Sequence, residues 1–171
     1  AVADPWICFG ERERRTAGLE ALRRCVGDHE GLVHGDLPRR PFVVRDGDRD
    51  FSDLIDLDGV DLILATRDLR HPQLQLFRTR EAVPPDSYSA IENSRTTPHG
   101  PIEVSRVLAE LESGATMTIV GAHELWPPLR QFCLDLSAIR AGSASVDIHL
   151  SASGPCDSGE RRAGTDCFVM Q

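Results

Sequence analysis

The run Ser145-Val146-Asp147-Ile148-His149-Leu150 decides the fold prediction for this chain. Polar and apolar residues alternate along it, which is the pattern of a β-strand with one buried face. A segment rich in Gly, Ser and Arg follows, and then the run Cys167-Phe168-Val169-Met170-Gln171. We therefore expect two short strands joined by a polar loop at the end of the chain.

The first part of the chain predicts a helix. Apolar residues recur at helical spacing between Glu11 and Val26, with Glu and Arg on the other faces, and Gly27 is a typical stop. Pro41-Phe42-Val43-Val44 then has the composition of a short strand.

Seven aspartates lie between Asp46 and Asp61. A calcium-binding EF-hand loop beginning at Asp46 would need Gly at position 51 and Glu at position 57, but Phe51 and Leu57 stand there, so calcium binding is rejected. We instead predict a turn and then a helix that Asp50 or Ser52 caps, with three residues facing the core: Phe51, Leu54 and Ile55. Residues 60–65 fit either a helix or a strand.

The middle of the chain alternates between strands and helices. We predict a strand around Leu74, Leu76 and Phe77, a long loop over residues 83–101, and a clear β run over residues 115–120. Pro101 is expected to start a helix that Gly114 ends, and Pro127-Pro128 to lie in the first turn of a helix that reaches about Arg140.

Composition limits the function. The formal net charge is −8 and the sequence pI is about 5.2, which argues against a nucleic-acid or anionic-membrane partner. All 19 basic residues are Arg, so lysine Schiff-base chemistry is excluded. Five cysteines form no C-x-x-C pair, and no apolar run is long enough to span a bilayer. We expect a cytoplasmic protein with reduced thiols.

The order of these segments resembles the JmjC-type cupin oxygenases. The resemblance rests on five stretches: residues 40–44, 51–55, 114–120, 123–129 and 166–171. It implies an α+β fold, a cupin/JmjC-like antiparallel β framework (a partial double-stranded β-helix) with packed helices. It also implies one domain over residues 1–171 that is incomplete at its C-terminus.

Members of that family use Fe(II) and 2-oxoglutarate, with iron held by a His-x-Asp pair and a later His. Alignment to the family pattern places Arg161 at the His position and Ala163 at the Asp position. Arg is a permanent cation and Ala has no donor atom, so neither residue can bind the iron. No metal ligand is therefore predicted.

Asp147 and His149 are the candidate catalytic residues. They are two apart on the expected strand, so both point to one face, while Val146, Ile148 and Leu150 point to the other. A His–carboxylate pair could act as a general base. The alternative is the polar face of a half-exposed strand.

These observations favour a binding or assembly module that has lost iron-dependent catalysis. The alternative is an Fe(II)/2-oxoglutarate-dependent hydroxylase of a peptide or small natural product with a displaced metal site. Because a half-barrel leaves strand edges open, we expect a second copy or a partner chain to complete the sheet.

Overall fold

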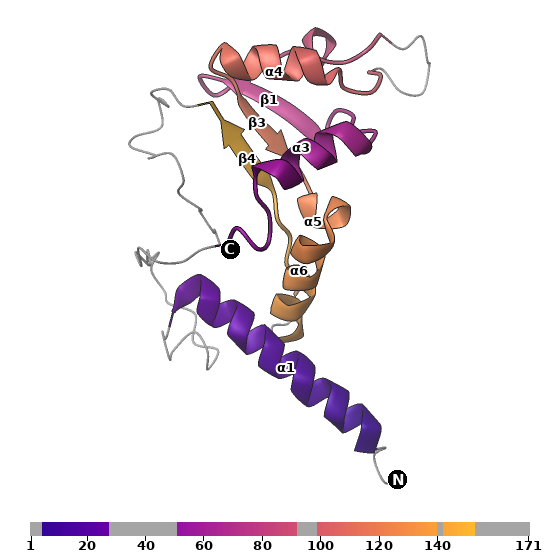
Figure 1. Cartoon of the computed structure of the whole chain (residues 1–171), viewed down its shortest axis with the longest axis vertical. Coiled ribbons are helices and arrows are strands. Elements are labelled where there is room, and N and C mark those ends of the chain that lie inside the picture. The colour runs from indigo at the N-terminus through magenta and orange to yellow at the C-terminus, as the bar shows by residue number, and fades with distance from the viewer. Residues whose placement is uncertain (1–4, 28–50, 92–98, 140–141, 153–171) are drawn as a thin grey trace.

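The computed structural model describes residues 5–27, 51–91, 99–139 and 142–152, with the side chains of residues 5–9 and 11 left out. The predicted strands at Pro41–Val44 and Cys167–Gln171 lie outside these ranges, as do Arg161 and Ala163. Within them, helices accompany an antiparallel sheet, which confirms the α+β class (Figure 1). No helix in these ranges has the length and apolarity needed to cross a membrane.

The sheet has four strands in the order β2-β1-β3-β4. They are β1 (Leu74–Arg78), β2 (Glu81–Ala82), β3 (Thr116–Ile119) and β4 (Ile148–Ser151). Every neighbouring pair is antiparallel, with Leu76 opposite Met117 and Met117 opposite Leu150. β4 is therefore the outer strand on one side of the described sheet.

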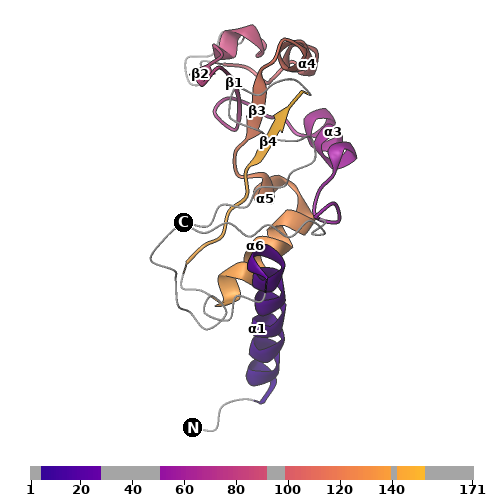
Figure 2. The same cartoon turned by 90° about the vertical axis from the view of Figure 1, so that its left-hand side faces the viewer.

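Two helices cover one face of this sheet, α3 (Leu57–Thr66) and α4 (Val104–Glu112), and Figures 1 and 2 show both on the same side. The strand residues that face them are fully buried in β1 and β3 and partly buried in β4. These strand residues and the buried residues of the two helices form one core. The strands contribute Leu74, Leu76, Met117, Ile119, Ile148 and Leu150, and the helices contribute Val60, Ile63, Leu64, Val107 and Leu111. The predicted separation of Ile148 and Leu150 from His149 is confirmed.

A pair of helices extends below the sheet in Figure 1. α1 (Pro5–Val26) packs on α6 (Pro127–Ile139), and Leu22 and Val26 of α1 are buried beside Leu136 and Ile139. The predicted stop is confirmed, since Gly27 follows α1 with φ of +69°. The helix begins at Pro5, earlier than the predicted Glu11, with proline at a first position that suits it.

Residues 51–55 form a turn, so the predicted helix at this point is wrong. Phe51 and Leu54 are nevertheless buried, as predicted. The helix starts after Asp56, whose carboxylate accepts the Gly59 N–H at 2.8 Å. Asp56, rather than Asp50 or Ser52, is therefore the N-cap of α3.

Pro101 does not start a helix. It forms an isolated β-bridge with Arg70, and its carbonyl accepts the Ala90 N–H at 2.8 Å. α4 begins at Val104 instead and ends before Gly114, whose φ is +90°. Pro127 and Pro128 open α6 as predicted, after the short helix α5 (Ala122–Leu125).

Candidate functional site

Polar side chains of β4 form hydrogen bonds with polar side chains of β3. His149 lies opposite Thr118, and its Nδ1 is 2.9 Å from the Thr118 hydroxyl. Ser151 lies opposite Thr116, with 2.7 Å between their hydroxyl oxygens. Thr118 is buried while His149 and Ser151 are exposed. This polar ladder lies on the strand where sequence placed the candidate catalytic residues.

Three hydrogen bonds attach the segment before β4 to the turn that opens α5. Ala122 N–H donates to the Val146 carbonyl at 2.8 Å, and Val146 N–H donates to His123 Nδ1 at 3.3 Å. Gly121 N–H donates to Asp147 Oδ1 at 2.8 Å. We call these five residues the β4 clip. It fixes the position at which the chain enters β4.

The backbone of Gly121 explains the shape of the clip. Gly121 has φ of +67° and ψ of +34°, the left-handed conformation that glycine adopts without a steric penalty. This conformation turns the chain from β3 into α5 within two residues. The turn brings the N–H groups of Gly121 and Ala122 to the segment before β4.

The candidate residues Asp147 and His149 have different partners. Asp147 lies just before β4 rather than on it, and its carboxylate accepts from the Gly121 N–H. His149 is on β4 and contacts Thr118. Both side chains belong to exposed residues. The structure thus assigns Asp147 a backbone-binding role, and general-base catalysis by the pair stays a prediction.

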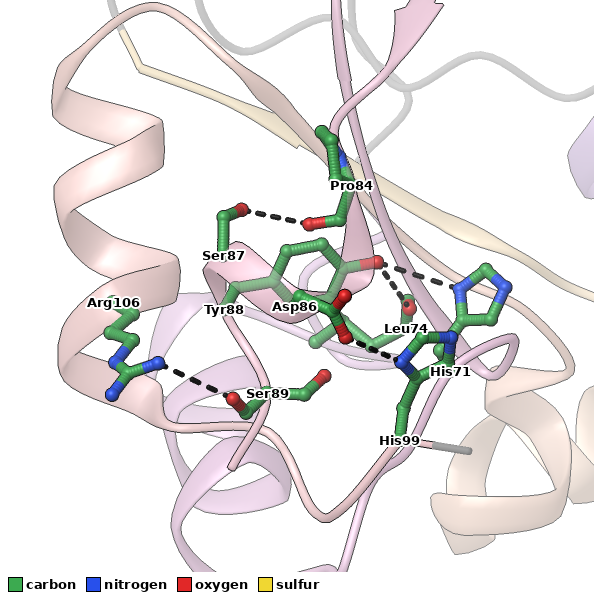
Figure 3. A network of polar contacts seen from close by, with 9 residues as sticks. All are labelled: His71, Leu74, Pro84, Asp86, Ser87, Tyr88, Ser89, His99 and Arg106. Carbon is green, nitrogen blue, oxygen red and sulfur yellow. Dashed lines mark hydrogen bonds and ion pairs between the residues drawn. The ribbon is translucent and has the colours of Figure 1, made fainter. Parts of the chain in front are cut away.

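A second polar cluster lies beside Leu74, at the start of β1 (Figure 3). His99 Nδ1 is 3.0 Å from Asp86 Oδ1, and the His71 and His99 rings meet edge to face with centroids 5.6 Å apart. The Tyr88 hydroxyl is 3.5 Å from both His71 Nδ1 and the Leu74 carbonyl. Burial raises the pKa of the Tyr88 hydroxyl, so it remains a neutral donor.

Sequence reasoning did not bring these residues together. In the sequence His71 and His99 each adjoin a proline, a setting typical of exposed histidines; His71 is exposed, and the His99 side chain is 24% exposed. Their proximity depends on tertiary bridges, Arg70 with Pro101 and Ser89 with Ile102. No local spacing could have signalled this arrangement.

The described residues contain no group of three His, Cys, Asp or Glu side chains that could hold a metal ion. Cys133 is a buried free thiol, and burial raises its pKa, which disfavours the reactive thiolate. Neither polar region therefore offers a complete metal or thiol site in these parts of the chain.

Comparison with known proteins gives no family. A scan against protein-family models, a search of curated proteins and a search of solved structures each found no match.

Proposed function

We propose that this chain is a binding or assembly module related to the JmjC-type cupins, that it works without iron, and that β4 is the strand through which it joins a second copy of itself. The observation that carries the proposal is the position of β4. It is one of the two edge strands of the described sheet, and β3 is its only partner among the strands in the described ranges. An outer strand presents backbone N–H and C=O groups that can pair with another chain.

The side chains of β4 do not protect this edge. Protein edges are commonly blocked by proline, lysine or other charges, or by a bulge. The strand Ile148-His149-Leu150-Ser151 has no proline, lysine or carboxylate. Ile148 and Leu150 are only partly buried against the core, so a further strand would remove more of their apolar surface from water.

A second copy is the partner that this strand fits best. Pairing about a two-fold axis places each strand opposite itself, which is unfavourable when the strand carries like charges. β4 has no permanently charged side chain. Its apolar residues would continue the helix-covered face into the second sheet, and His149 and Ser151 would continue the polar face.

The test compares two serine-to-lysine variants of the full chain. Ser151→Lys places a lysine ammonium group of each copy at the proposed two-fold interface, where the two repel. Ser105→Lys makes the same change on the exposed side of α4. Sedimentation over a range of concentrations should show a dimer for the wild type and Ser105→Lys, and a dimer weakened about tenfold or more for Ser151→Lys. A wild-type monomer at every concentration would overturn the proposal.

Iron-free action has a separate test. The purified chain is incubated with Fe(II) and 2-oxoglutarate, and metal uptake and succinate are measured. We expect neither stoichiometric iron nor succinate above the level without protein. Stoichiometric iron with succinate release would contradict this part of the proposal and favour the hydroxylase alternative.

A further inference from the structure

His123 holds the β4 clip in a way that depends on its protonation state. Its Nδ1 accepts the Val146 N–H at 3.3 Å, and a backbone N–H can only donate. Nδ1 must therefore carry the lone pair, and the proton of the neutral ring must be on Nε2. An imidazolium has a hydrogen on both nitrogens, so proton uptake replaces this acceptor with a donor that faces another donor.

The other histidine beside β4 lacks this dependence. His149 Nδ1 pairs with the hydroxyl of Thr118 at 2.9 Å. A hydroxyl can donate to a neutral Nδ1 or accept from a protonated one by rotating about its C–O bond. The contact between β3 and β4 through His149 therefore persists in both protonation states, and the sensitivity is concentrated at His123.

The segments that contact α5 carry charged residues of both signs, and Arg67 at the C-terminal end of α3 donates to the Leu125 carbonyl at 2.9 Å. Arg130 of α6 donates to the carbonyls of His123 at 3.4 Å and Glu124 at 2.6 Å. Glu124 follows in α5, and Asp147 lies in the segment before β4 with its carboxylate on Gly121 N–H. The two arginines disfavour a positive ring, and the two carboxylates favour one. The effect of protonation on the clip thus comes from the loss of Nδ1 as an acceptor rather than from one dominant neighbouring charge.

We propose that His123 is a proton-sensitive latch at the entry to β4: the neutral ring accepts the Val146 N–H, and the protonated ring releases that N–H and leaves the clip with its two bonds from Gly121 and Ala122. The consequence for assembly rests on the proposed function, because a loosened entry to β4 presents a less ordered edge to a second copy. Acidification from about pH 8 to about pH 5 crosses the range in which protein imidazoles commonly take up a proton.

The test uses His123→Asn in the full chain. The side-chain oxygen of asparagine can take the place of Nδ1 as an acceptor, and it does not titrate in this range. His71→Asn is the matched control at an exposed histidine outside the clip. The readouts are the ¹⁵N–¹⁵N coupling across the Val146–His123 hydrogen bond and the protection of the Val146 amide against hydrogen exchange, corrected for the intrinsic effect of pH.

In the wild type and in His71→Asn we expect the coupling at about pH 8 but not at about pH 5, and an approximately tenfold loss of Val146 protection, which is the size of one hydrogen bond. Protection in His123→Asn should be the same at both pH values. The latch is overturned if wild-type protection does not change with pH, or if His123→Asn changes as the wild type does.

Sedimentation of the same samples separates the two proposals. Dimers at about pH 8 that are weakened at about pH 5 only when His123 is present would support both. A monomer at both pH values whose Val146 protection still follows His123 would overturn assembly through β4 and leave the latch standing.

Discussion

Gly18 of α1 crosses α6 so closely that a Cβ atom at this position would lie 2.4 Å from the Asp135 carbonyl oxygen and 2.6 Å from the Ile139 Cγ2 atom. The Asp135 carbonyl belongs to the backbone of α6, so it cannot move away without displacing the helix. Gly18→Ala should therefore lower the free energy of unfolding by about 1–3 kcal/mol, in the range of overpacked interiors. Urea denaturation provides the measurement.

Gly10 is the matched control in the same helix. A Cβ atom there would meet nothing within 4 Å. Gly10→Ala should raise stability by roughly 0.5–1 kcal/mol, because alanine favours the helix more than glycine does. If both variants were stabilised, the close crossing of α1 and α6 would be wrong.

Ser89 carries a buried hydroxyl with no hydrogen-bond partner in the structure, and the residue is 1% exposed. Removing an unsatisfied buried hydroxyl relieves its desolvation cost. Ser89→Ala should leave stability unchanged or raise it by up to about 1 kcal/mol. Thermal and urea unfolding both measure this change.

Ser137→Ala is the contrasting variant. The Ser137 hydroxyl donates to the Cys133 carbonyl at 2.7 Å and accepts the Ala144 N–H at 3.0 Å. Its loss should cost about 0.5–1.5 kcal/mol. A larger loss for Ser89→Ala than for Ser137→Ala would mean that the Ser89 hydroxyl has a partner, such as an ordered water.

Asp53 should make stability depend on pH in the acid range. Its hydrogen bond with Arg24 lowers the pKa of the Asp53 carboxyl below the ordinary value of 3.8. A carboxyl whose pKa is lower in the folded than in the unfolded state stabilises the fold at pH values above its unfolded pKa. This contribution is lost as the pH falls through the folded pKa. Because Asp53 is largely exposed, we expect at most about 1 kcal/mol.

The measurement compares the wild type with Asp53→Asn by urea denaturation from neutral pH to below pH 3.8. The wild type should be more stable at neutral pH, and the difference should shrink as the pH falls below that value. A difference that is constant with pH would show that the ion pair does not contribute.

Trp126 joins the end of α5 to the turn at residues 51–55. Its indole N–H donates to the Leu54 carbonyl at 2.8 Å. Trp126→Phe keeps an aromatic ring but removes the donor, so stability should fall by at least about 0.5–1.5 kcal/mol. Equal stability of the two proteins in urea denaturation would contradict a structural role for this bond.

The parts of the fold that follow from local pattern could be predicted from sequence. The alternation around His149 gave the faces of β4 correctly, and Gly27 and the two prolines of α6 mark real boundaries. These signals act through the residue's own backbone or its immediate neighbours. They need no knowledge of the distant chain.

The failures occurred where tertiary contacts decide the local structure. Pro101 has a suitable backbone for a helix start, but its carbonyl pairs with Ala90 and Ile102 N–H pairs with Leu69. Phe51 and Leu54 are buried without a helix between them, since a turn suffices to place both in the core. The hydrogen bond from Val146 to His123 likewise depends on two separate segments.

The order of the strands also determines when the sheet can form. β1 and β2 are joined by a tight turn, but β1 pairs next with β3 and β3 with β4, each across a long intervening stretch of chain. Closing such loops costs entropy before the contacts between strands form, which slows folding. During synthesis from the N-terminus, β1 to β3 are made before β4, so β4 can join a sheet whose other three strands are already available to pair.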